Sequence, residues 1–416
     1  QFVVASGAGA PGDTASSGIA GAFSLGRFDA VTEASLSDDV DTVIEARGDG
    51  TGGALSVTAT DAANMLVVAG VEPTPGALSI GHSAAMTMLD RDTRVVLGSP
   101  TDLDYRAFET QPGHYYENRP FLFDQYEPVR DQRLGRVTLA ATDAVDTTTI
   151  AYSGLDDDGA PTERPAPPTQ IGDIELDPDA LVTRESGSGE QGDTTDGAKG
   201  GFALSGAFAS TGGSSSALVY VGQLGTVSVA ELNAEATVSG SDTTMASGRP
   251  AAGEGVSIAG AFAYTGLDRQ AEALLRGPRI ASDDAVTIRA TVDGASVNAA
   301  SGASGEAGSV SLAGSFAYSA GRRDGRVELG AIAIDAGDAP LLVTARSGGS
   351  IATSAGAQAS AGQGEAQVGI GAAVAIDAGT STADIDIVTY RAGLAVAPRP
   401  GVGLSGGDVF EPGLVV

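Results

Sequence analysis

A nine-residue phrase with large residues at alternate positions recurs along the chain, and it limits the possible folds more than any other feature. In the copy at 256–264, Val256, Ile258 and Phe262 share one parity, and Ser and Ala occupy the other. An alternation with a period of two predicts a β-strand, because an amphipathic helix needs spacings of three and four. The copies are FALSGAFAS (202–210), VSIAGAFAY (256–264), VSLAGSFAY (310–318), VGIGAAVAI (368–376), the weaker SGIAGAFSL (17–25) and the degenerate LSIGHSAAM (78–86).

The spacing of the copies predicts a repeat architecture. The last four copies start 54, 54 and 58 residues apart, and the earlier intervals are 61 and 124 residues. A unit of this size cannot bury its faces alone, whereas stacked units bury a continuous core. The positions expected to recur structurally are Gly21, Gly206, Phe208, Gly260, Phe262, Gly314, Phe316 and Val374.

A second phrase follows most copies of the first. It reads LSVTATD (55–61), VTLAATD (137–143), VTIRATV (286–292) and LLVTARS (341–347). Apolar and polar residues alternate in it, which predicts strands with one buried and one wet face. Shorter apolar stretches lie between the two phrases, and Ser/Thr/Ala/Gly tails follow the second. We therefore expect three or four strands in each unit, separated by Gly, Asp and Ser turns.

These patterns predict an all-β, repetitive and elongated β-solenoid (β-helix-like) with two inserted loops. Sparse aromatics (5%) and abundant small residues favour a thin solenoid over a thick sandwich core. We divide the chain into solenoid repeat 1 and the start of repeat 2 (1–97), an aromatic-rich insertion (98–133), the end of repeat 2 (134–154), a Pro/acid-rich arm or linker (155–200), and repeats 3 to 6 (201–416).

The insertion at 98–133 differs abruptly in composition from the repeats around it. Tyr and Arg pack large contact areas at modest entropic cost, so this loop is typical of a contact surface. It could form a subunit interface, bind a sugar or protein ligand, or fold back and cap one flank of the solenoid. The candidate contact residues are Tyr105, Phe108, Tyr115, Tyr116, Arg119, Phe121, Phe123 and Tyr126.

The insertion at 155–200 has a Pro run and a Ser/Gly/acidic tail, which indicate an extended arm or linker. Its apolar centre (Ile171, Ile174, Leu176, Leu181 and Val182) could anchor it along a sheet edge or add a strand to a neighbouring molecule. A solvated loop is the other interpretation.

Charge and composition exclude several classes of function. The 53 acidic and 23 basic residues give a net charge of −30, which disfavours nucleic acid and anionic membrane surfaces as partners. The chain has no Cys, so it has no disulfides and no thiolate chemistry. No apolar stretch is long enough to span a bilayer as a helix. Since the chain starts at Gln1 rather than Met, we expect a processed product or a part of a longer polypeptide.

Candidate catalytic and metal-binding residues are few, and we predict no catalytic or metal site. His82 and His114 are the only histidines, which makes a zinc site improbable. The Asp clusters at 156–158 and 283–284 could serve polysaccharide cleavage, but turns favour Asp for backbone capping. Asp-rich turns also offer oxygen ligands for calcium, although no calcium-binding repeat recurs. We therefore expect no cofactor, with calcium as the alternative.

The chain resembles the repeat regions of very large bacterial surface proteins, the filamentous-haemagglutinin-like and giant adhesin families. The matching residues are 255–264, 273–277 and 285–292, with their counterparts in other copies, over about two thirds of the chain. This resemblance implies an extracellular, elongated β-solenoid used for adhesion or as a structural stalk. The two insertions are departures from a plain stalk repeat.

We therefore expect a non-enzymatic, extracellular structural protein of the bacterial cell surface: a segment or subunit of a filament, sheath or giant adhesin. Its expected partners are further copies of itself or further repeats of a longer chain. The first alternative is an adhesin that binds carbohydrate or protein through the 98–133 loop. The second is a polysaccharide-degrading β-helix enzyme.

Overall fold

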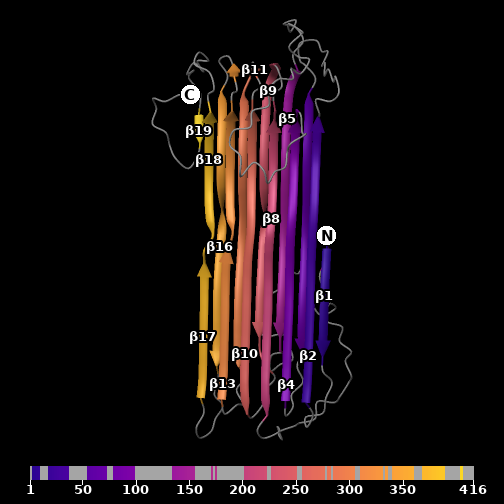
Figure 1. The fold of residues 1–416 in the computed structure, drawn as a ribbon, viewed down its shortest axis with the longest axis vertical. Helices are drawn as coiled ribbons and strands as arrows, with labels where there is room; N and C mark the ends of the chain where they lie inside the picture. Colours follow the sequence, from indigo (N-terminus) through magenta and orange to yellow (C-terminus); the bar gives the residue numbers. More distant parts are fainter. Residues whose placement is uncertain are drawn as a thin grey trace.

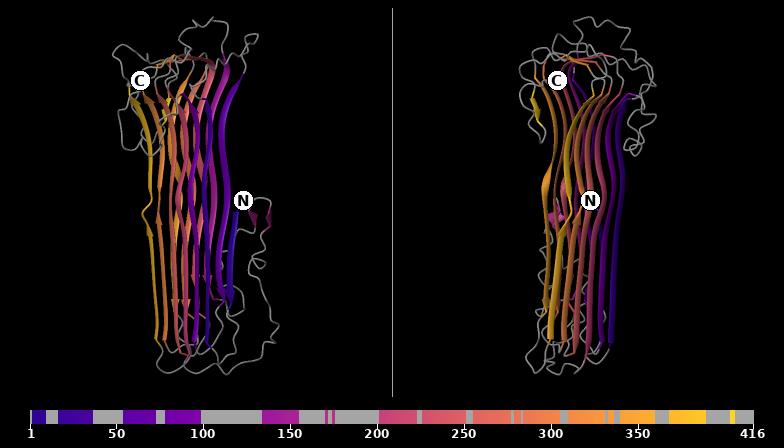
Figure 2. Two further views of the ribbon diagram at one scale, coloured as in Figure 1. Left: turned by 45° about the vertical axis from the view of Figure 1, so that its right-hand side comes forward. Right: turned by 60° about the vertical axis from the view of Figure 1, so that its left-hand side comes forward.

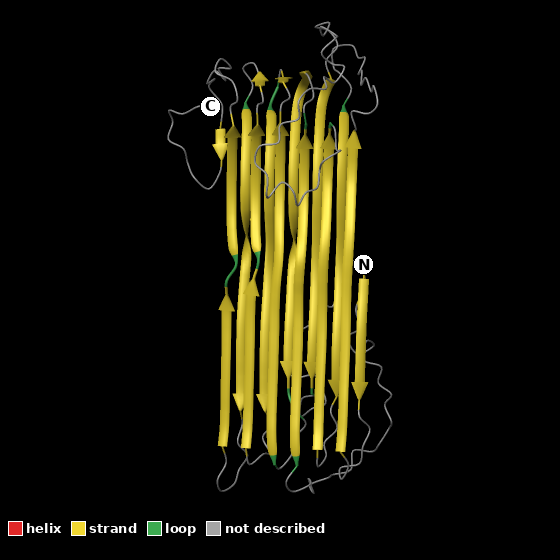
Figure 3. Cartoon of the chain, in the orientation of Figure 1, coloured by secondary structure: helices red, strands yellow, loops and turns green. Residues whose placement is uncertain are grey.

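The computed structural model is built from long parallel strands, and its described residues contain no helix (Figure 3). The described residues are 2–9, 17–36, 54–72, 78–98, 134–154, 170–171, 174–175, 201–222, 226–250, 255–276, 279–282, 284–304, 310–330, 333–335, 340–359, 368–388 and 403–405. The strands run along the long axis of the molecule and form two facing layers (Figures 1 and 2).

The first layer, sheet B, has the parallel order β17-β13-β10-β8-β4-β2, with β14 pairing β10 and β18. Each copy of the nine-residue phrase opens one of its strands. A break at Gly321 separates β13 from β14, and the next unit is divided in the same way between β17 and β18. The strands are β2 (Ser17–Leu36), β4 (Leu78–Leu97), β8 (Phe202–Val221), β10 (Val256–Arg276), β13 (Val310–Ala320), β14 (Arg322–Gly330), β17 (Val368–Asp377) and β18 (Thr380–Val388).

The second layer, sheet A, has the parallel order β1-β3-β5-β9-β12-β16-β19, and the short β11 pairs β9 and β15. Most of its long strands begin at or just before the second phrase. In each turn the chain thus runs along sheet B and returns along sheet A. This architecture is a two-layered solenoid. The strands are β1 (Phe2–Gly9), β3 (Leu55–Glu72), β5 (Leu134–Ser153), β9 (Thr226–Gly248), β11 (Arg279–Ser282), β12 (Val286–Ser304), β15 (Ala333–Asp335), β16 (Leu341–Ala359) and β19 (Gly403–Ser405); β6 (Gln170–Ile171) and β7 (Ile174–Glu175) form a separate antiparallel pair.

The predicted fold class is confirmed, and the copies of the phrase lie in register. Gly206, Gly260 and Gly314 occupy one row of sheet B, and the phenylalanines two residues later occupy another. The weaker copies join the same rows, since Gly21 pairs His82 and His82 pairs Gly206. In the last copy Ala372 and Val374 take the Gly and Phe positions.

The expectation of three or four strands in each unit holds for the units that begin at 256, 310 and 368. It is wrong for the units that begin at 17, 78 and 202, whose described residues form two long strands each. The phrase at 256–264 and the apolar stretch at 272–277 lie in one strand, β10, up to its last residue Arg276. The second phrase at 286–292 and its tail likewise form the single strand β12. A fifth copy of the second phrase, at 232–238, pairs with 137–143 and 286–292 but was not recognised in the sequence. It keeps the same alternation, with Asn233 and Glu235 at the outward positions that Thr287 and Arg289 occupy in β12.

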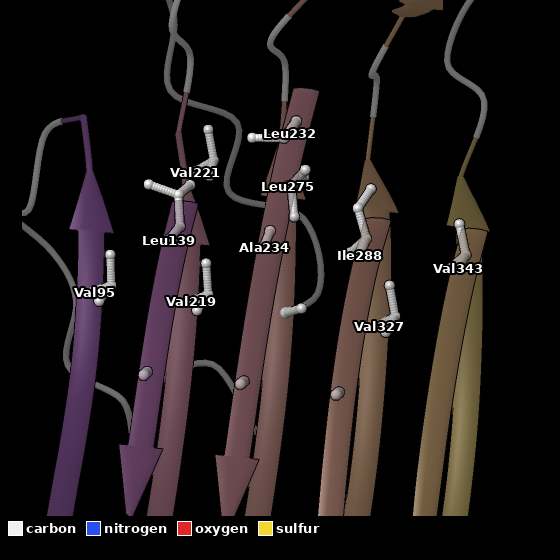
Figure 4. Close-up of a cluster of buried hydrophobic side chains, with 14 of the residues drawn as sticks. Val95, Leu139, Val219, Val221, Leu232, Ala234, Leu275, Ile288, Val327 and Val343 are labelled. Atoms are coloured by element: carbon white, nitrogen blue, oxygen red, sulfur yellow. The ribbon is translucent and has the colours of Figure 1, made fainter. Parts of the chain in front are cut away.

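One half of the space between the sheets holds a conventional aliphatic core. It lies at the carboxyl ends of the sheet B strands and the amino ends of the sheet A strands, where the side chains meet from both layers (Figure 4). In the second phrase Val286, Ile288 and Ala290 are buried and the alternate residues are partly exposed, as predicted. Labelled members of this core are Val95, Leu139, Val219, Val221, Leu232, Ala234, Leu275, Ile288, Val327 and Val343.

The other half is packed mainly with small side chains, chiefly alanine, serine and threonine. In sheet B it is the small parity of the phrase that faces inward, for example Ala259, Ala261 and Ala263, and the bulky parity faces outward. Glycines allow the two backbones to approach closely here. A Cβ atom added to Gly248 would lie 2.2 Å from the carbonyl oxygen of Gly260 in the opposite sheet. The sheets are therefore held closer at this end than branched side chains would permit.

Gly248→Ala is expected to lower the free energy of unfolding by about 1–3 kcal/mol, because the added methyl group forces the two backbones apart. Gly314→Ala is the matched control, since a Cβ atom there meets nothing within 4 Å. It is expected to be neutral or slightly stabilising, because alanine restricts the unfolded chain. Chemical denaturation followed by circular dichroism measures both. Equal effects of the two substitutions would contradict the close approach of the sheets.

Candidate interaction surface

The outward side chains of the six phrase segments (17–25, 78–86, 202–210, 256–264, 310–318 and 368–376) form one continuous surface, which we call the apolar face. They lie in five rows across sheet B because the strands are in register. One row is Ile or Leu throughout, the next is mostly Gly, and the third is mostly Phe. Bulky ridges therefore alternate with a shallow line of glycines.

Aromatic rings stack along this face. The ring centroids of Phe208 and Phe262 are 5.3 Å apart with an interplanar angle of 7°, and those of Phe262 and Phe316 are 5.3 Å apart at 11°. Tyr264 and Tyr318 stack at 5.8 Å in the next row. Ladders of this kind stabilise neighbouring strands. Because the central rings cover one another's faces, they present their edges outward.

The apolar face carries no Asp, Glu, Lys or Arg, although the chain has 76 such residues (53 acidic and 23 basic). Its side chains are most exposed at the two edges of the sheet: Ile19 is 70% and Phe23 60% exposed on one edge, and Ile370 is 56% exposed on the other. Contiguous exposed apolar surface of this extent marks an interaction site in soluble proteins.

The edges of sheet B are open among the described residues. β2 ends the sheet on one side and β17 with β18 on the other. The amides of the outward residues Val256 and Val310 donate to the carbonyl oxygens of Gly201 and Gly255, which directly precede β8 and β10, at 2.9 and 3.4 Å. Since parallel strands alternate their bonding sides residue by residue, the outward residues of β2 direct their amides toward the open edge.

An ionic layer is buried between the sheets, at the boundary of the aliphatic and alanine regions. Arg91 of β4 lies 2.8 Å from Asp143 of β5 and 2.8 Å from Asp61 of β3, and the side chains of Arg91 and Asp143 are fully buried. Arg269 of β10 lies 2.7 Å from Asp242 of β9, with both side chains at most 2% exposed. Charges removed from water this completely need such partners.

Hydroxyl groups complete the ionic layer. Ser215 donates to Asp143 at 2.9 Å, and Thr147 donates to Asp242 at 2.8 Å. Burial nevertheless raises the pKa of Asp143 from 3.8 to about 6, against the opposing effects of Arg91 and Ser215. Burial also raises the pKa of Asp242, and the charge of Arg269 is the largest effect that opposes this rise. These ion pairs and hydrogen bonds connect sheet B to sheet A at one level along the strands.

The sequence did not lead us to this layer, although a signal was present. Arg91, Arg269 and Arg323 each lie thirteen residues after the start of the phrase in their units, and the register places them in one row. They share the inward parity of the phrase, where an apolar or small residue is expected. A charge that recurs at a buried parity indicates a partner in the opposite sheet.

All eight predicted structural repeat residues lie in two neighbouring rows of sheet B, whereas the predicted contact loop lies outside the described residues. Gly21, Gly206, Gly260 and Gly314 share the glycine row, and Phe208, Phe262, Phe316 and Val374 share the aromatic row. The insertion at 98–133, with all eight of its candidate contact residues, lies outside the described residues, as does nearly all of the arm at 155–200.

The remaining chemical candidates lie apart from one another. His82 is exposed in the glycine row, next to Gly206. Asp284 is exposed in a turn, and its backbone amide donates to the carbonyl oxygen of Ala230 at 2.7 Å. His114, Asp283 and the aspartates at 156–158 lie outside the described residues. Within the described ranges no three His, Asp or Glu side chains gather in a group that could hold a metal ion.

Among the described residues no helix is long and apolar enough to cross a membrane. Comparisons with protein-family models, with curated proteins and with solved structures yield no match to this chain.

Proposed function

We propose that the chain is a non-enzymatic structural protein of the bacterial cell surface, a solenoid segment or subunit of a filament, sheath or giant adhesin. The observation that carries this proposal is the in-register parallel ladder, in which the described residues leave a strand open at each side of sheet B. Unpaired edges of this length readily bind another strand. The extracellular location rests on the resemblance of the repeats and on the acidic, cysteine-free composition.

The two open edges are complementary. If β2 of a second copy continues the ladder beyond β17, its phrase SGIAGAFSL meets VGIGAAVAI in the same register that relates all other copies. Ile19 then continues the row of Ile370, and Phe23 continues the row of Val374. A contact between two different edges does not close on itself, so repetition of it generates a fibre. Further repeats of the same polypeptide would occupy these edges in the same way.

Val31→Pro tests this edge. Val31 is an outward residue of β2 and is 66% exposed. Its amide faces the open edge, so proline removes a donor that the described fold does not use but that a stacked neighbour needs. We expect the wild type to form rods in electron micrographs, and a mass in light scattering that grows with concentration. The variant is expected to remain at the mass of its smallest species, with an unchanged circular dichroism spectrum.

Thr32→Pro is the control for the direction of the bond. The amide of this inward residue faces β4, so the substitution removes a ladder bond within the chain and is expected to lower the melting temperature. Val31→Ala is expected to stack normally. Wild-type protein that stays monodisperse at high concentration, or a Val31→Pro variant that still forms rods, would contradict edge-to-edge stacking.

A further inference from the structure

We infer that the apolar face is a second, lateral interface, through which two copies of this chain pair sheet to sheet. This inference goes beyond edge-to-edge stacking, which lengthens the ladder and leaves the apolar face uncovered. The face spans nine residues along the strands and six strands across. At about 3.3 Å per residue and 4.8 Å between strands, it covers on the order of 700 Å². A stable protein interface buries about 800 Å² on each partner.

The order of large and small residues fits a second copy of the same face most fully in β8, and the central Gly–Phe pair recurs in β2, β10 and β13. In β8 the outward residues read Phe202, Leu204, Gly206, Phe208, Ser210 and Gly212. Each large residue in one half of this series has a small one at the mirror position: Phe202 with Gly212, Leu204 with Ser210, and Phe208 with Gly206. A series with this symmetry is complementary to its own reverse.

A two-fold axis parallel to the stacking direction brings these pairs together. It lies between the glycine and aromatic rows and sets strands of the two copies antiparallel. Phe262 of one copy then covers Gly260 of the other, Phe316 covers Gly314, and the relation is reciprocal, as a two-fold interface requires. Val256 meets Gly266 in the same way. The phenylalanine ridge of one sheet thus enters the glycine line of the other, whereas Ile258 meets Tyr264 and Leu312 meets Tyr318 as pairs of large residues.

Other occupants fit this face less well. A sugar ring stacks on the face of an aromatic ring, but the faces in the middle of the Phe208–Phe262–Phe316 ladder are already covered by their neighbours at 5.3 Å. A charged partner finds no Asp, Glu, Lys or Arg to pair with. The glycine row itself has no packing role within the described chain at two of its positions: a Cβ atom on Gly314 meets nothing within 4 Å, and one on Gly260 lies 3.9 Å from the nearest atom.

The test fills this row. In the double variant Gly260→Val/Gly314→Val each added Cβ atom fits the isolated chain, and the outward side chains occupy the space that the phenylalanines of a second copy need. We expect its free energy of unfolding to equal or exceed that of the wild type, because valine favours strands. We expect association through the face to weaken by at least tenfold. Gly348→Val is the matched control, since a Cβ atom there also meets nothing within 4 Å but the residue lies on the outer side of sheet A.

The readouts separate the lateral contact from edge stacking. The Val31→Pro background blocks the edge, and sedimentation equilibrium then reports the lateral pair: a dimer with wild-type or Gly348→Val faces, and a monomer with the double variant. In rods, the double variant is expected to halve the mass per unit length without shortening them. Ser210→Glu, a change at a partly exposed hydroxyl, is expected to have the same effect. A dimer that survives both changes, or a monomeric Val31→Pro protein, would overturn the inference, whether or not rods form.

Discussion

Replacing Arg269 by Met is expected to lower the free energy of unfolding by about 3–5 kcal/mol, the largest effect of any single change considered for this chain. Arg269 and Asp242 form a buried pair at 2.7 Å, and the substitution leaves the carboxylate of Asp242 between the sheets without its cation. The hydroxyl of Thr147 still donates to it, and the more distant charge of Arg323 still acts on it. Denaturant unfolding followed by circular dichroism at pH 7 gives the difference.

Two further variants isolate the cause. Removing both charges, in Arg269→Met/Asp242→Leu, is expected to recover most of the loss, because apolar residues of similar volume commonly replace a buried ion pair at little cost. Arg289→Met removes an exposed arginine that lies 3.6 Å from Glu235 on the outer side of sheet A. Exposed pairs contribute about 1 kcal/mol or less, so this control is expected to change little. A double variant as unstable as Arg269→Met would show that the arginine acts through packing alone.

Acidification from pH 7 to pH 4 is expected to stabilise the protein, contrary to the usual acid denaturation. Burial raises the pKa of Asp143 from 3.8 in the unfolded chain to about 6 in the folded one. Between these values the folded state holds a proton that the unfolded state has released, so stability is greatest below pH 3.8 and falls as the pH rises through 6. The difference corresponds to on the order of 3 kcal/mol. The raised pKa values of Asp92, Asp242 and Glu272, each caused mainly by burial, act in the same direction.

Asp143→Asn identifies the source of this pH dependence. Asparagine keeps the shape of the side chain and cannot titrate, so the slope of unfolding free energy against pH between 4 and 6 is expected to flatten in the variant. The decline in net charge from −30 as other carboxylates protonate also relieves repulsion, but it does so equally in both proteins. A wild type that loses stability steadily between pH 7 and pH 4 would contradict the raised pKa of Asp143.

The alternation of residue size made the strands and their register predictable. A period of two identifies a strand from one copy alone, and the 54-residue spacing of Val256 and Val310 specifies which residues become neighbours in the ladder. The buried parity of the second phrase was equally clear, because Val286 and Ile288 alternate with Thr and Arg. Short sequence patterns that repeat at fixed intervals thus predict which distant residues pair in the sheet.

Two features could not be obtained from local patterns. The Asp and Gly residues near 293 and 294 have the composition of a turn, yet β12 passes through them because its neighbours on both sides hold the backbone in register. In the nine-residue phrase the alanines face inward, although Val, Ile and Phe are the residues that proteins usually bury. Which set of residues faces inward depends on how near the opposite sheet lies. The facing glycines at 248 and 302 reveal that distance.

The orientation of the long strands has a mechanical consequence. Backbone hydrogen bonds point along the stacking direction, so a force applied along the strands loads the bonds of an entire 20-residue strand such as β4 in shear, and they must fail together. A force across the stack instead opens neighbouring strands a few bonds at a time, as a zipper opens. We expect single-molecule pulling to find a material that is stiff and strong in one direction and easily peeled in the other.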